Sequence, residues 1–227
     1  MTPPTPTPPS VPTPRSLPVR APMRIVRASY LDIHDVTSLI AAAFADLDVA
    51  GWLVPAPNDR PLVLYAQFRM LVEHAAEHGF IDLTGDRLAA AVWFPREAPL
   101  PEIHGYEQRL QAACGRYTDR FHALDTAFEA HHPTQAHHHL ALLAVDPRHH
   151  GQGHGTALLR HHHTHLDHHD MPAYLEAASP RSRALYLRHG YRDHGTPIDL
   201  PDQGPRLWPM WREPRPTSPP PALGWAC

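Results

Sequence analysis

The chain has 227 residues, of which 42% are hydrophobic, so it can form the core of one domain of ordinary size. All 20 basic residues are arginine, and the absence of lysine excludes a Walker-type phosphate loop, a pyridoxal Schiff base and a lysine nucleophile. A net charge of −3, only two cysteines and no long apolar run predict a cytoplasmic protein without nucleic-acid or membrane partners.

Two proline-rich segments flank the predicted domain. Residues 1–22 hold nine prolines among Thr, Ser and Arg, and residues 214–227 have a similar composition. Segments with so little apolar surface to bury are expected to be disordered tails. The remaining core, residues 23–213, has a near-ordinary proline content and is expected to form a single domain.

The first half of the core predicts strands and helices in alternation. Apolar spacings of three and four residues indicate helices, and alternation bounded by turn residues indicates strands. In chain order, the pattern predicts a strand over 23–27, a helix after Asp32, a helix from Pro61 to Gly79, a β-hairpin over 80–94, and helical turns over 103–128 interrupted at Gly115.

The second half of the core predicts the same classes of element. In chain order, they are a strand over 140–145, a helix over 156–169, a short buried strand over 173–177, a helix from Pro180 to near Gly190, and strands near 191–194 and 207–212. The mixture of strands and helices along the whole core places the protein in the α/β class.

A glycine-rich loop joins the strand over 140–145 to the next helix, in the sequence LLAVDPRHHGQGHGTALL. Gly151, Gly153 and Gly155 alternate just before the helix, which is expected to open at about Thr156. Alternating glycines let several backbone N–H groups point into one space, and a helix N-terminus favours an anion. The loop therefore predicts a pyrophosphate site, with a glycine-rich surface turn as the alternative. It lacks the lysine of a P-loop and the G-x-G-x-x-G spacing of a dinucleotide site.

The strand, the pattern V-x-P-x-x-x-G-x-G-x-G and the helix resemble the acetyl-coenzyme A signature of the GNAT N-acetyltransferases. The stretch PAYLEAASPRSRALYLRHGY resembles the second half of that signature, and the resemblance covers about residues 24–213. The AAFAD stretch, the long helical excursion and PAYLE…SPR…LY…GY look most like the puromycin N-acetyltransferase group. The resemblance implies a mixed, mostly antiparallel central sheet with helices on both faces, splayed where Val145 and Glu176 face each other.

The same resemblance implies acetyl-CoA as co-substrate and places its contacts. Leu143, Ala144 and Val145 are expected to pair their backbone with the pantetheine arm. The loop that would wrap the pyrophosphate, mostly through backbone atoms, consists of His150, Gly151, Gln152, Gly153, His154, Gly155 and Thr156. The family normally has Gln or Arg where His150 stands. It often has Asn where Ser182 stands, and a serine hydroxyl is expected to bond the coenzyme with a shorter reach.

Two side chains are candidates for the chemistry. Tyr186 matches the position of the general acid in many GNAT enzymes, and a neutral phenol can protonate the thiolate that aminolysis of a thioester releases. The alternative for Tyr186 is a packed structural tyrosine. Glu176 is expected either to take the proton of the incoming ammonium or to hold the cationic amine, with a solvated carboxylate at a strand end as the alternative.

The resemblance thus implies an enzyme that transfers acetyl directly to a primary amine in a ternary complex. No covalent intermediate is expected, so Cys114 is not needed, and a backbone N–H near Val145 would stabilise the tetrahedral intermediate. The puromycin-type features favour a small amine, such as an aminonucleoside antibiotic, over a protein N-terminus or lysine. A coenzyme A sensor without activity and a histidine-rich metal-binding protein are the non-enzymatic alternatives. A monomer and a homodimer both remain open.

Fourteen of the 21 histidines lie between His131 and His169. His161, His165 and His169 share one helix face at a spacing that suits zinc, but without a helical glutamate or a cysteine partner. We therefore expect no metal site and treat these histidines as adventitious surface residues. His162 falls on the core face of the same helix.

Several further residues keep two interpretations. His137, His138 and His139 enter the central strand and could flank the active site, but nothing in the sequence selects one of them. The aromatic residues Trp52, Trp93 and Phe94 either line an acceptor pocket or pack in the core, and Tyr191 is expected in the core.

Overall fold

The computed structural model describes residues 23–216, so the predictions for residues 1–22 and for residues 217–227 lie outside the described part. The described helices are α1 (Ile33–Phe44), α2 (Asp48–Leu53), α3 (Arg60–His78), α4 (Tyr106–Cys114), α5 (Thr118–His131), α6 (His154–His168) and α7 (Pro180–Arg188). The described strands are β1 (Ile25–Arg27), β2 (Phe80–Thr84), β3 (Ala89–Pro95), β4 (His138–Val145), β5 (Ala173–Ala177), β6 (Arg192–Asp193), β7 (Ile198–Asp199) and β8 (Arg206–Arg212).

These strands form an open sheet in the order β1-β2-β3-β4-β5-β8-β6, and β7 pairs with β8. Every neighbouring pair is antiparallel except β4 and β5, which run parallel. A parallel pair needs a crossover connection, and α6 supplies it. The predicted α/β class, with a mixed and mostly antiparallel sheet, is confirmed.

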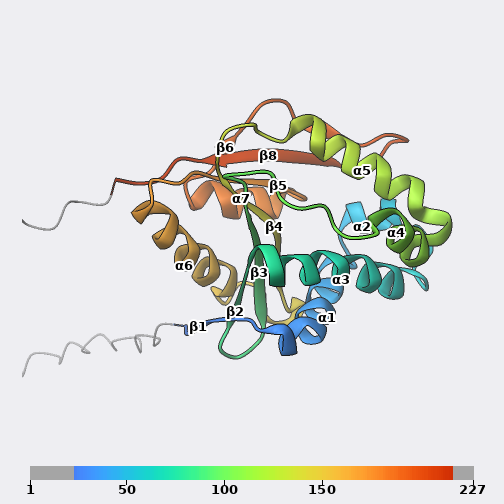
Figure 1. The fold of residues 1–227 in the computed structure, drawn as a ribbon, viewed down its shortest axis with the longest axis horizontal. Helices are drawn as coiled ribbons and strands as arrows, with labels where there is room; N and C mark the ends of the chain where they lie inside the picture. Colours follow the sequence, from blue (N-terminus) through green and yellow to red (C-terminus); the bar gives the residue numbers. More distant parts are fainter. Residues whose placement is uncertain (1–22, 217–227) are drawn as a thin grey trace, which may run out of the picture.

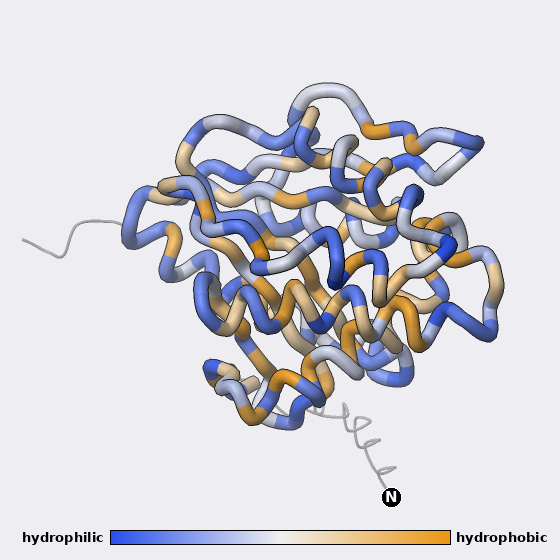
Figure 2. Tube along the Cα trace, turned by 45° about the vertical axis from the view of Figure 1, so that its right-hand side comes forward, coloured by the Kyte–Doolittle hydropathy of each residue, from blue (hydrophilic) through white to orange (hydrophobic). Residues whose placement is uncertain are grey.

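Helices cover both faces of the sheet (Figure 1). α1 and α3 pack on one face, where residues such as Val36, Leu64 and Leu142 form the larger core. α6 and α7 cover the other face, where Leu158 and Leu175 belong to a second core. Hydrophobic segments gather where the strands meet the helices, whereas the outer loops are mostly hydrophilic (Figure 2). The sheet therefore separates two packed layers, as expected for a domain of this class.

The central strand β4 carries an irregularity that positions the site. Val92 of β3 pairs with Leu142, but the next residue, Trp93, pairs with Leu140, so Ala141 is an extra residue in β4. Such a β-bulge bends the strand and interrupts its ladder. The parallel pairing of β4 with β5 is confined to the start of both strands, where His138 and His139 oppose Ala173 and Tyr174. Beyond the bulge β4 and β5 are no longer paired, which leaves a gap in the sheet.

The structure refines several predicted boundaries. α6 begins at His154, two residues before the expected start, and β4 extends back to His138. α2 and β7 have no counterpart among the predicted elements. α2 is too short to show a helical period, and two residues of β7 show no alternation, so tertiary contacts rather than local pattern define both.

Candidate functional site

The glycine loop adopts the left-handed backbone that its sequence predicts. Gly151 has φ +77° and Gly153 has φ +93°, where a side chain would be strained. Gly153 is also the N-cap residue of α6. No atom lies within 4 Å of where a Cβ would stand on either glycine, so the backbone of the loop faces open space.

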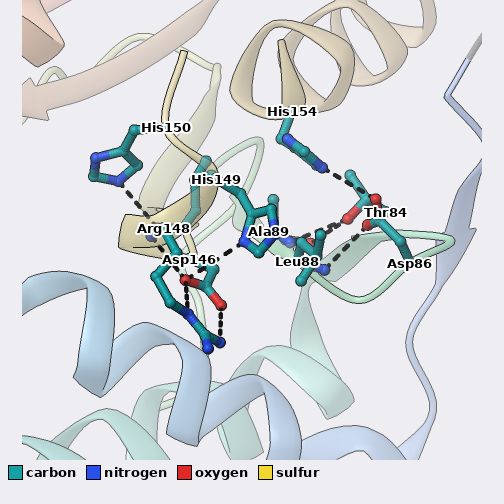
Figure 3. Close-up of polar contacts among 10 residues, drawn as sticks. Thr84, Asp86, Leu88, Ala89, Asp146, Arg148, His149, His150 and His154 are labelled. Atoms are coloured by element: carbon teal, nitrogen blue, oxygen red, sulfur yellow. Dashed lines mark hydrogen bonds and ion pairs between the residues drawn. The ribbon is translucent and has the colours of Figure 1, made fainter. Parts of the chain in front are cut away.

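Side chains of the loop and of the neighbouring β2–β3 turn brace this backbone (Figure 3). Asp146 accepts a hydrogen bond from the backbone N–H of Arg148 at 2.9 Å and from its guanidinium at 2.8 Å. Hydrogen bonds from Arg148 hold the pKa of Asp146 well below its usual range. The imidazole Nε2 of His154 lies 3.1 Å from the Asp86 carboxylate in the β2–β3 turn. The loop is therefore held in shape from within and from the turn beside it.

A cavity of about 380 Å³ lies beside the loop. Its lining includes four of the predicted coenzyme residues, namely Gln152, Gly153, His154 and Thr156. Met23, Asp86, Leu88, Ala157 and Arg160 complete the lining. The predicted loop thus borders a space open to a ligand. The imidazole of His150 points elsewhere, because its Nε2–H donates to the carbonyl oxygen of Val145 at 3.1 Å.

The start of α6 lies against the end of β4 and against α7. A Cβ added to Gly155 would lie 3.6 Å from Leu185, 3.7 Å from Leu143 and 3.8 Å from Val145. Ala144, between the last two, is buried in the larger core on the opposite face. Among the strand residues predicted to hold the coenzyme, Leu143 and Val145 therefore face the loop with their side chains, and Ala144 contributes only backbone on that side.

Neighbouring residues hold both predicted site residues of α7 in place, Tyr186 by ring packing and Ser182 by hydrogen bonds. Tyr186 is 7% exposed, packs edge-on against Tyr191 at 5.7 Å, and has a pKa raised by burial. Its phenol is consequently protonated at neutral pH. Ser182 completes a capping box at the start of α7, where its Oγ accepts from the N–H of Ser179 and donates to the Ser179 carbonyl oxygen. That hydroxyl is engaged locally and must exchange a bond to contact a coenzyme.

On the opposite face of the sheet, Glu176 contacts a residue that the sequence did not select. Its Oε2 lies 2.9 Å from Nε2 of His139, and the two side chains are 5% and 15% exposed. The other carboxylate oxygen, Oε1, is buried and has no hydrogen-bond partner. A buried carboxylate oxygen without a donor is costly, so this atom suits an N–H group of a ligand.

Neutral histidines surround this pair. The Nε–H of Arg96 donates to Nε2 of His132 at 3.1 Å, and His137 lies beside His132. Burial lowers the pKa of His132 to about 3 and that of His137 to about 4. Burial also lowers the pKa of the Arg96 guanidinium, and Glu176 opposes that effect. At neutral pH the rings of His132 and His137 are therefore neutral.

The candidate residues lie on two sides of the sheet. Tyr186 belongs to the core beneath α6 and α7, as do Leu175 and Ala177 of β5. Glu176 alternates with these residues along the strand, so it faces the layer that contains α5. Both candidate side chains lie close to the stretch where β4 and β5 are no longer paired.

Of the remaining aromatic candidates, some pack in the core and one borders a cavity. Trp93 is fully buried and Phe94 is 5% exposed, so both pack in the core. Trp52 borders a second cavity of about 540 Å³, together with Asp46 and Asp48. Tyr191 is in the core, as predicted, and its hydroxyl contacts His163 at 3.0 Å.

His161, His165 and His169 are exposed, as expected for that face of α6, and His162 faces the core as predicted. Four further histidines are buried, namely His137, His138, His154 and His163. Within residues 23–216, no three His, Cys, Asp or Glu side chains are placed to hold a metal ion, and no helix is long and apolar enough to cross a membrane.

Comparisons with known proteins agree with this geometry. Residues 114–193, which include the glycine loop and the gap, match the family model described as acetyltransferase (GNAT) domain. A solved structure described as histone acetyltransferase HPA2 and related acetyltransferase, from Corynebacterium glutamicum, is 26% identical with a TM-score of 0.66, covering 88% of this chain and 100% of that one.

Two more distant structures share the fold. An arylalkylamine N-acetyltransferase 2 from Aedes aegypti is 13% identical with a TM-score of 0.58, covering 85% of this chain and 99% of that one. A polyamine N-acetyltransferase from Drosophila melanogaster is 18% identical with a TM-score of 0.56, covering 84% and 99%. The open sheet with a bulged, splayed pair of parallel strands is the GNAT fold.

Proposed function

Because the chain is a transferase enzyme with a GNAT acetyltransferase domain, we propose that it transfers an acetyl group from acetyl-CoA to the primary amine of a small molecule. One observation carries the proposal: β4 and β5 separate beyond His139 and Tyr174, directly beside a glycine loop that opens a helix. A backbone edge and an anion site are thereby adjacent. Acetyl-CoA requires both, for its amide-bearing arm and for its pyrophosphate.

We assign acetyl-CoA to the residues around the gap. The backbone of Leu143, Ala144 and Val145 binds the pantetheine arm, and the loop from His150 to Thr156 binds the pyrophosphate. The open space around Gly151 and Gly153 fits this role, as does the cavity beside the loop. Ser182 is assigned a supporting contact through its hydroxyl.

The reaction then proceeds by direct transfer. The ammonium of the acceptor loses its proton near Glu176, and the free amine attacks the thioester carbonyl carbon. A tetrahedral intermediate forms, its nitrogen gives up a second proton to solvent, and its oxygen is stabilised by a backbone N–H near Val145. The carbon–sulfur bond breaks, and Tyr186 gives its proton to the departing thiolate. The phenolate of Tyr186 is reprotonated from solvent, so the net products are the amide, free coenzyme A and one proton.

The proposed class of acceptor rests on the sequence resemblance and on the names of the structural neighbours. The sequence features that resemble puromycin N-acetyltransferases favour an aminonucleoside-like amine. Structural neighbours named for polyamines, agmatine and arylalkylamines act on small amines of other kinds. The neighbour named as a histone acetyltransferase favours a protein amine as the second candidate.

A thiol-release screen tests the proposal. The full chain is incubated with acetyl-CoA and, separately, with puromycin, agmatine, spermidine, tryptamine, a lysine-containing peptide and a peptide with a free N-terminus. We expect free thiol to appear only when an amine is present, and to appear fastest with a small amine. Faster turnover of a peptide supports the second candidate. Tight acetyl-CoA binding with no turnover on any amine identifies a sensor and contradicts the proposal.

A further inference from the structure

We propose that His139 is the base that removes the proton from the acceptor ammonium, and that Glu176 anchors this amine and orients the imidazole. The inference deepens the proposed function and rests on it. It also decides between the two roles that the sequence left open for Glu176, because the carboxylate becomes the anchor and the histidine becomes the base.

The contact between the two side chains determines the tautomer of His139. An ionised carboxylate only accepts hydrogen bonds, so Nε2 of His139 carries the hydrogen that is shared with Glu176 Oε2 at 2.9 Å. In the neutral ring, Nδ1 is then the acceptor. The carboxylate therefore fixes the orientation of the ring and leaves Nδ1 as the nitrogen that can take a proton.

The free oxygen of Glu176 completes the arrangement. Oε1 is buried without a hydrogen-bond partner, Oε2 is shared with the imidazole, and the Tyr174 phenol lies beside the carboxylate. A cationic amine that donates one N–H to Oε1 satisfies this oxygen and lies beside the His139 ring. Nδ1 is on the edge of the ring away from Glu176, so the proton passes to it through one bridging water, and the nitrogen lone pair becomes available for the thioester.

The groups that face His139 come from four segments. Glu176 and Tyr174 extend from β5, His132 follows α5, Arg96 follows β3, and His137 precedes β4. Burial and the neighbouring Glu176 raise the pKa of Tyr174, so its phenol is uncharged. Arg96 and Glu176 are the charged groups of this set.

The two neighbouring histidines do not compete for the proton. His137 contacts the Gln135 carbonyl oxygen through Nδ1 at 2.7 Å, and His132 accepts from Arg96 through Nε2. Burial lowers the pKa of both rings, to about 4 and about 3. They remain neutral at the pH of the reaction. His139 is the ring of the three that combines a carboxylate partner with partial exposure.

The first test is the pH dependence of kcat/KM with the best amine of the screen. We expect His139→Gln to lower kcat/KM at neutral pH by about 100-fold or more and to remove the acid limb assigned to the base. Glu176→Gln is expected to raise KM for the amine, because the variant lacks the anchoring carboxylate. His161→Gln, on the exposed side of α6, is the matched control and should leave the profile unchanged.

The second test does not require turnover. In the ¹⁵N NMR spectrum of the full wild-type chain, His139 should be the Nε2–H tautomer. An Nδ1–H tautomer overturns the inference, and this measurement needs no variant to fold. An active enzyme whose His139→Gln variant keeps both rate and acid limb also overturns it. Absence of thiol release by the wild-type chain with every amine instead contradicts the proposed function, and the NMR result still decides the pairing.

Discussion

The imidazole of His162 lies flat against the indole of Trp93, with ring centroids 4.0 Å apart and planes inclined by 7°. The same imidazole contacts His138 at 3.0 Å and the Asp82 carboxylate at 3.3 Å. All four side chains are buried between the sheet and α6. A polar network therefore occupies a position where most domains have an apolar layer, and its histidines are neutral because burial lowers their pKa.

This burial predicts a loss of stability in acid. Burial lowers the pKa of His138 to about 3 and that of His163 to about 2, whereas both titrate near 6.5 when unfolded. Below pH 6.5 the unfolded chain takes up protons that the folded chain does not. Each histidine therefore lowers the free energy of unfolding by up to about 1.4 kcal/mol per pH unit until its folded pKa is reached. Urea unfolding at pH 7, 6 and 5 measures this, and an unchanged free energy contradicts the prediction.

The space between Gly155 and the side chains of Leu143, Val145 and Leu185 predicts a steric effect on coenzyme binding. An alanine Cβ there would make ordinary contacts with Leu143, Val145 and Leu185, whereas a leucine would extend into the space between them. We expect Gly155→Ala to leave the Kd for acetyl-CoA within about threefold and Gly155→Leu to raise it more than tenfold. Titration calorimetry measures both values, and the alanine variant is the matched control. Equal affinity of the leucine variant would place the coenzyme elsewhere.

Local pattern sufficed for some features and not for others. The glycine loop was predictable because Gly151 and Gly153, just before a helix, permit a left-handed backbone without help from distant residues. The core-facing position of His162 was also predictable, from its helical spacing with Leu158 and Leu166. Its partners were not, since Asp82 and Trp93 reach it from separate strands.

The sequence of β4 alone does not show which of its histidines contacts Glu176. Three consecutive histidines enter β4, and the alternation of the strand places His138 and His139 on opposite faces. Which face meets Glu176 depends on the parallel register of β4 and β5, which the α6 crossover separates in sequence. The bulge at Ala141, which ends that pairing, has no local sequence signal.

Removing the phenolic hydroxyl of Tyr186 should slow the step in which the thiolate leaves. We expect Tyr186→Phe to lower kcat by about 100-fold while the Kd for acetyl-CoA is unchanged, because the buried ring still packs on Tyr191. Stopped-flow detection of thiol at saturating acetyl-CoA measures kcat, and calorimetry measures the Kd. A variant with full kcat would show that the phenol has only a packing role.

The contact between Asp86 and His154 predicts that the β2–β3 turn supports the glycine loop. Asp86→Ala removes the carboxylate that lies 3.1 Å from the imidazole and leaves the loop braced only by its own residues. We expect the Kd for acetyl-CoA to rise about three- to tenfold, with no change in KM for the amine, since the acceptor approaches from the other side of the sheet. Asp199→Ala is the matched control, because it breaks an exposed pair with Arg206 on β7 and β8 and should leave both constants unchanged. Similar losses in the two variants would mean that the turn acts on general stability rather than on the loop.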